Sequence, residues 1–196
     1  MWVTHDGMTV ATSVANGLQA ALLLARGRPE GLRYVSADMA SAARSFWAAA
    51  ICLPAFICLT LIGWKQSGLP SYPEHAFALD LLCYVIGWSG FALLSHPIAG
   101  GLGRASRWPI FIVVWNWCNV VQNLLCVTAG IPVLLGAPAW VCETSWLVAY
   151  GWALWLEWYA ARLSLQVSSV TAAGLVALDV LLGLFLVGLS AAVMPG

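Results

Sequence analysis

SFWAAAICLPAFICLTLIGW, residues 45–64, decides the fold, because twenty mostly apolar residues without a charge can cross a lipid bilayer as a helix. At 1.5 Å per residue, about 20 helical residues cover the hydrocarbon core, which is roughly 30 Å thick. Four more apolar stretches follow along the chain, at residues 76–97, 108–129, 140–163 and 169–193. The sequence therefore predicts an all-α fold, a polytopic integral membrane helix bundle with five transmembrane helices.

The overall composition agrees with a membrane environment. Of the 196 residues, 62% are hydrophobic and 8% are charged, whereas a soluble domain is about 25% charged. The net charge is zero and no basic tract occurs, which excludes nucleic acid as a partner. The six cysteines form no C-x-x-C pair, so we interpret them as small, reduced hydrophobes and expect neither a metal site nor a cofactor.

The segment before the first span has a different pattern. Residues 8–25 place apolar side chains on one helical stripe and polar ones opposite, which is typical of a helix lying in the membrane interface. Gly27 and Pro29 then end this helix. We therefore divide the chain into a cytoplasmic N-terminal segment with an amphipathic helix, residues 1–40, and a five-helix transmembrane domain, residues 41–196. A sixth span over residues 8–25 is the alternative.

The positive charges fall on one side of the predicted spans. Lys65 is the single basic residue in a connection on the other side. The seven on the first side are Arg26, Arg28, Arg33, Arg44, Arg104, Arg107 and Arg162. Because cytoplasmic loops carry the excess of basic residues, this pattern predicts a bacterial inner (cytoplasmic) membrane protein with its N-terminus in the cytoplasm and its C-terminus outside.

Prolines give two local predictions. Residues 130–139 contain Pro132 and Pro138 and are predicted to form a tight external loop, because proline disrupts a regular helix. The pair His96–Pro97 is predicted to mark the end of the second transmembrane helix.

Ionisable and amide side chains inside the spans are the candidate functional residues, because polar groups at membrane depth tend to face the bundle interior. Asp179 is predicted near mid-membrane, about 15 Å from the start of its helix, and Glu157 nearer the cytoplasmic edge. Asp80 is an outer-side acid that need not belong with them. The predicted intramembrane polar cluster is Asn116, Asn119, Gln122, Asn123, Glu157 and Asp179.

Two interpretations of this cluster remain open. The acids and amides can form a proton or ion path, which requires an aqueous route to Asp179. They can also act as hydrogen-bonding contacts that fix helix register, each worth about 0.6–2 kcal/mol, and this second interpretation is favoured because no basic partner lies at that depth. No nucleophile motif or phosphate-binding glycine loop occurs, so no catalytic residues and no enzymatic activity are expected.

The order of segments RPEGLRYV (28–35), ARSFWAAAICLPAF (43–56) and WNWCNVV (115–121) resembles small five-span membrane proteins of alphaproteobacteria and is distantly similar to the Yip1-type five-span fold. That resemblance implies a scaffold-like role in which the chain associates with other membrane proteins. It implies no functional residues.

Three functions follow as hypotheses. The first is a non-enzymatic scaffold or interaction partner for membrane proteins or lipids, which includes homo-oligomers. The second is a small proton- or ion-coupled carrier or channel using Asp179 and Glu157. The third is an accessory subunit of a respiratory or photosynthetic membrane complex, in which the tryptophans pack against cofactors held by its neighbours.

Overall fold

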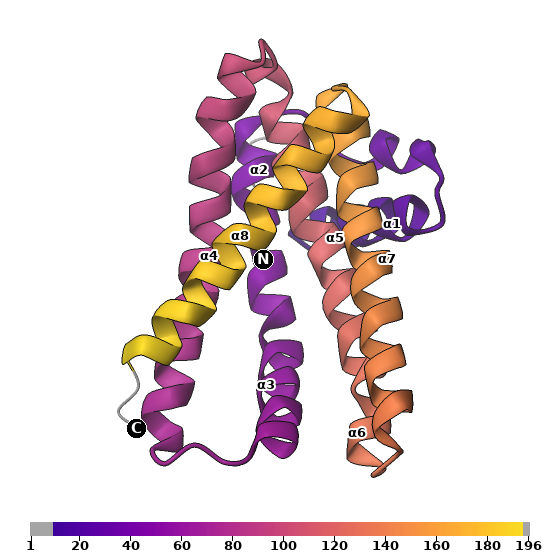
Figure 1. The fold of residues 1–196 in the computed structure, drawn as a ribbon. Coiled ribbons are helices and arrows are strands. Elements are labelled where there is room, and N and C mark those ends of the chain that lie inside the picture. The colour runs from indigo at the N-terminus through magenta and orange to yellow at the C-terminus, as the bar shows by residue number, and fades with distance from the viewer. Residues whose placement is uncertain (1–9, 194–196) are drawn as a thin grey trace.

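The computed structural model describes residues 10–193, which form an all-helical bundle (Figure 1). Its elements are α1 (Val10–Ala25), η1 (Pro29–Tyr34), α2 (Met39–Ser45), α3 (Trp47–Ser67), α4 (Pro73–Gly101), η2 (Ala105–Arg107), α5 (Trp108–Ala129), α6 (Ile131–Leu134), α7 (Ala139–Leu165) and α8 (Ser169–Val193).

Four stretches of the described chain are long and apolar enough to cross a membrane, so the chain is a polytopic membrane protein. They are Met39–Ser67, Pro73–Gly101, Ala105–Leu134 and Ser169–Val193. Each contains one predicted span, and the prediction is confirmed for these four. The fifth predicted span corresponds to α7, a helix of 27 residues that carries Glu143, Glu157 and Arg162 and is less apolar than the other four.

The proline predictions were wrong in two places. Residues 131–134 form the short helix α6 because Pro132 occupies its first turn, where the missing N–H costs no hydrogen bond. Pro97 lies inside α4, which continues to Gly101 rather than ending at His96. A proline within a long apolar helix bends it without ending it when neighbouring helices hold both parts in place.

α1 lies across α5 rather than alongside it (Figure 1). Gly17, in the middle of α1, packs on the indole of Trp117, and the carbonyl of Gly27, just after α1, accepts a 2.8 Å hydrogen bond from Tyr159 Oη on α7. Trp117 lies nine residues from the start of α5 and Tyr159 six residues from the end of α7, so both contacts lie within about 5 Å of the same level. Between Gly17 and its C-terminal end, α1 therefore runs nearly perpendicular to the axes of α5 and α7.

α5 is the central helix of one half of the bundle. From Trp108 to Cys118 its side chains are almost all buried, enclosed by α1, α2, α3 and α7. From Val121 to Thr128 they are half-buried or exposed. The bundle is thus densely packed at the end where α5 begins and looser at the end where it finishes. We call these regions the packed half and the open half.

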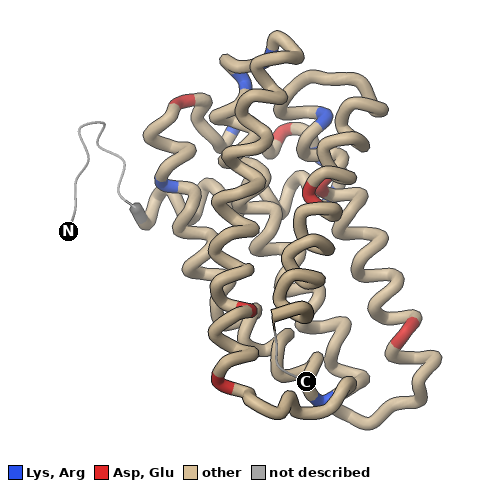
Figure 2. Tube along the Cα trace, turned by 60° about the vertical axis from the view of Figure 1, so that its left-hand side comes forward, with Lys and Arg blue, Asp and Glu red and all other residues tan. Residues whose placement is uncertain are grey.

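The charges follow the same division. Figure 2 shows most Lys and Arg positions toward one end of the molecule and one position at the opposite end. That opposite position is Lys65 at the end of α3, whose Nζ donates a 2.9 Å hydrogen bond to the carbonyl of Leu134. The arginines of η1, η2 and the last turns of α2 and α7 belong to the packed half.

Candidate functional site

Two cavities of about 580 and 570 Å³ lie side by side among α3, α4, α5, α7 and α8 in the open half. Both are lined by Leu59, Asn119, Tyr150 and Asp179, so the two cavities share a wall. Both are open clefts, and their volumes fall within the range of sites that bind small molecules.

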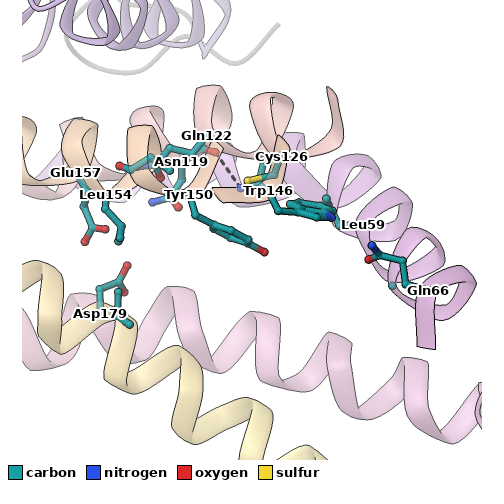
Figure 3. Close-up of a pocket in the computed structure, with 14 residues that line it drawn as sticks. Leu59, Gln66, Asn119, Gln122, Cys126, Trp146, Tyr150, Leu154, Glu157 and Asp179 are labelled. Carbon is teal, nitrogen blue, oxygen red and sulfur yellow. Dashed lines mark hydrogen bonds between the residues drawn. The ribbon is translucent and has the colours of Figure 1, made fainter. Parts of the chain in front are cut away.

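The first cavity, which we call the amide cavity, is lined by carboxamide side chains from two helices (Figure 3). Asn119, Gln122 and Asn123 come from α5, and Gln66 comes from the end of α3. Gln122 Nε2 donates a 2.8 Å hydrogen bond to the carbonyl of Ala153, which ties α5 to α7. The amide cavity therefore has a polar wall along α5 and a fixed helix pair behind it.

Glu157 on α7 and Asp179 on α8 point toward one another across the amide cavity (Figure 3). Glu157 is buried and Asp179 is half-buried, and their carboxyl groups are close enough to interact electrostatically. No described residue lining either cavity is Lys, Arg or His. The pair therefore has no positive partner from the lining residues.

Trp115 adds an unsatisfied donor beside this pair. Its side chain is 5% exposed, and its buried Nε1 makes no direct hydrogen bond although it lies near both carboxyl groups. A buried N–H without an acceptor costs about 1–3 kcal/mol. Carboxyl groups and indole together leave unused hydrogen-bonding capacity at one point of the cavity wall.

The second cavity, which we call the two-acid cavity, extends along α8 from Asp179 to Ser190. Ser190 Oγ donates a 3.2 Å hydrogen bond to Asp80 Oδ1 on α4, and both residues line this cavity. Asp80 therefore shares a cavity with Asp179, although no sequence pattern grouped it with the intramembrane polar cluster.

The predicted amide face of α5 is divided by the structure. Asn119 and Asn123 line the amide cavity and donate to backbone carbonyls one turn earlier, at 3.0 and 2.9 Å. Asn116 is fully buried in the packed half, where its Nδ2 donates a 2.7 Å hydrogen bond to Ser45 Oγ. It lines neither cavity, because its side chain points toward α2.

Sequence reasoning missed several lining residues. Tyr150 lines both cavities, and its position seven residues before Glu157 on α7 places the two on one helical face. That spacing could have identified it. Gln66, near the exposed end of α3, had no such signal, because only the three-dimensional arrangement brings it to the amide cavity.

A cluster of aromatic rings lies at the end of the two-acid cavity nearer the packed half, which Trp88 and Trp115 line. Phe91 and Trp115 are stacked with ring centroids 4.6 Å apart, and Trp88 contacts Trp115 edge to face at 5.4 Å. Phe111 contacts Phe91 at 6.0 Å from the other side. Among described residues, neither cavity is lined by any part of α5 before Trp115 or of α8 before Asp179.

Comparison with known proteins found no match among family models, curated proteins or solved structures. The resemblance to five-span proteins therefore stays a prediction, and the function is argued from the geometry alone.

Proposed function

We propose that this chain is a small ion-coupled membrane carrier that binds a cation between Glu157 and Asp179. The observation that carries the proposal is the position of these two carboxyl groups, which face one another at the amide cavity, with Asp179 also lining the two-acid cavity. Ionisable residues at membrane depth are costly and mark substrate or ion pathways. Two neighbouring acids without a basic lining residue are compensated best by a bound cation or by protons.

The closed end of the cavities supports a carrier over an open channel. Trp88 and Trp115 line the two-acid cavity at the end nearer the packed half, and Phe91 stacks on Trp115 behind them. A carrier exposes its site to one side of the membrane at a time, by moving one group of helices against another. A site open toward one half and sealed toward the other is what such a mechanism requires.

We propose that α7 is the fifth span, since its 27 residues are about 40 Å long and it packs between α5 and α8. The arginine-rich packed half then faces the cytoplasm of a bacterial inner membrane, with the N-terminus inside and the C-terminus outside. α1 lies in the cytoplasmic interface, and the two cavities open away from the cytoplasm.

The acids and amides that line the cavities suit the binding of a cation, so we propose binding and transfer rather than catalysis. The scaffold and accessory-subunit functions stay predictions. Neither requires cavities of this volume, so the cavities favour the carrier.

Flux through reconstituted protein tests the proposal. Liposomes holding the protein and a pH-sensitive dye are exposed to gradients of Na⁺, K⁺ or putrescine, and internal pH is recorded. We expect wild-type flux above that of empty liposomes for at least one cation. Asp179→Asn keeps a hydrogen-bonding group but cannot carry a negative charge, so we expect flux to fall about tenfold or more.

Glu143→Gln is the matched control. Glu143 is an exposed acid on α7 that lines neither cavity, so its neutralisation is expected to leave flux unchanged. Equal flux in wild-type protein and Asp179→Asn would contradict the proposal. The comparison is made on proteins that elute as single species and melt at similar temperatures.

A further inference from the structure

The two-acid cavity has a carboxyl group at each end. Asp179 lies at the end nearer the packed half, and Asp80, paired with Ser190, lies at the other. Asp179 and Ser190 are eleven positions apart on α8, which corresponds to about 16 Å along the helix. A ligand that uses both acids must therefore be elongated.

Between its ends the two-acid cavity is apolar and aromatic. Leu182 and Leu186 line it from α8, and Tyr84 and Trp88 line it from α4. The rings of Tyr84 and Trp88 lie 6.0 Å apart, and aromatic faces attract ammonium groups as well as methylene chains. Such a middle section suits an aliphatic chain that carries positive charges, and it does not suit a hydrated metal ion.

The small residues of α8 leave room for this chain. Gly183 lies one turn after Asp179, on the same helical face, and lines the two-acid cavity. A Cβ at Gly183 would meet nothing within 4 Å. The middle of the cavity is therefore open beside α8, between the two acids.

The unsatisfied donor at the Asp179 end also points to a ligand. The Nε1 of Trp115 lies near enough to the carboxyl groups of Glu157 and Asp179 to interact with both, yet it forms no hydrogen bond within 3.5 Å. An ammonium group supplies three donors and no acceptor, so it can bridge both carboxylates and leave an oxygen lone pair for the indole N–H. Its binding would compensate the carboxylate charges and give the indole N–H an acceptor.

From these observations we propose that the two-acid cavity binds a linear aliphatic polyamine, with one terminal ammonium at Asp179, which faces Glu157 of the neighbouring amide cavity, and the other at Asp80. The proposal rests on the proposed function in taking Asp179 as a cation site, and it adds the chemical class of the substrate. A span of about 16 Å corresponds to roughly 13 bonds of an extended chain. Spermine, whose terminal nitrogens lie about 13 bonds apart, matches this span, whereas putrescine is too short to reach both ends.

Binding of spermine and putrescine to the purified protein tests the proposal. The protein is held in nanodiscs of phosphatidylcholine, which has no net charge and does not itself attract polyamines, and dissociation constants are measured by calorimetry. We expect wild-type protein to bind spermine at least about tenfold more tightly than putrescine, because spermine reaches both acids and also carries four positive charges against two. The test of the span is therefore the loss of this preference in a variant that lacks one acid.

Variants at the two ends of the cavity then show how much each acid contributes to binding. Asp80→Asn still accepts the hydrogen bond from Ser190, and it is expected to weaken spermine binding about tenfold while leaving putrescine binding unchanged. Asp179→Asn is expected to weaken both amines, because both place an ammonium at that end. Glu143→Gln is expected to change neither.

Failure of the two proposals gives different results. If spermine and putrescine bind wild-type protein equally and Asp80→Asn affects neither, while Asp179→Asn weakens both, the polyamine proposal is overturned and the cation site stands. If Asp179→Asn leaves both affinities unchanged, both proposals are overturned. If Asp80→Asn fails to fold, Gly183→Leu provides the second test, because it fills the middle of the two-acid cavity between the acids. It should weaken spermine binding and leave putrescine binding unchanged, and equal effects on both amines would overturn the polyamine proposal.

Discussion

The two halves of α5 have opposite surroundings although they belong to one uninterrupted helix. In the packed half, Ile112 is fully buried and Asn116 finds its partner on another helix, Ser45. In the open half, Leu124 is 59% exposed, and Asn119 and Asn123 donate to carbonyls of their own helix. The first half holds neighbouring helices in place, and the second presents polar groups to a cavity.

This difference shows how one helix can serve both stability and binding. An interhelical hydrogen bond such as that of Asn116 fixes the positions of two helices. An amide that bonds within its own helix fixes no neighbour, and its oxygen stays available to a ligand. In the open half, the α5 amides that hold a neighbouring helix are reduced to Gln122, which bonds to α7, while Asn119 and Asn123 face the amide cavity.

The largest contrast is expected from truncating one aliphatic side chain in each half of α5. Ile112→Ala leaves a void among tightly packed neighbours and should lower the free energy of unfolding by about 2–5 kcal/mol. Leu124→Ala removes a side chain that makes few contacts and should cost less than about 1 kcal/mol. Unfolding with denaturant in detergent measures both, and equal costs would show that the two halves do not differ in packing.

A smaller effect is expected from adding a methyl group where α1 packs against α5. The Cβ added by Gly17→Ala would overlap the indole of Trp117, which is 1% exposed and cannot move aside, so we expect a loss of about 1–3 kcal/mol. Gly151→Ala on α7 is the control, because a Cβ at Gly151 meets nothing within 4 Å. Both substitutions replace a helical glycine by alanine, so both raise the intrinsic helix propensity by a similar amount. A melting temperature unchanged by Gly17→Ala would mean that α1 does not pack on Trp117.

The smallest effect concerns Asp38, the N-cap of α2 in the packed half. Slight burial raises the pKa of Asp38. Hydrogen bonds from the backbone N–H and the hydroxyl of Ser41, together with the positive charge of Arg44, outweigh this effect and hold the pKa below the usual 3.8. A lowered folded-state pKa means that the ionised carboxylate stabilises the fold above about pH 4, and this stabilisation is lost as pH falls through the folded value.

We expect Asp38→Ala to cost about 0.5–2 kcal/mol at neutral pH, which is the usual effect of losing an N-cap. Melting curves of wild-type protein and variant should converge as pH falls from about 5 to about 3. A difference in stability that stays constant over this range would show that the charge of Asp38 contributes nothing.

The helices were predictable from the sequence and the cavities were not. Long apolar stretches must form helices in a membrane, because each backbone group needs a partner within its own segment. Which faces meet depends on packing between distant segments. Asn116, Asn119 and Asn123 fall on one face by helical periodicity, yet α2 covers the first and leaves the other two beside a cavity. Asp80 joins the two-acid cavity only because α4 and α8 pack together.

The contact between Gly17 and Trp117 has a consequence for how the protein is made. The two residues are one hundred positions apart, so α1 leaves the ribosome long before the helix that it packs against. At typical rates of synthesis the delay is roughly 5–20 s, which is long compared with the formation of a helix. During that interval the face of α1 around Gly17 lacks the indole that covers it in the finished fold. Assembly of the packed half therefore waits for the middle of the chain.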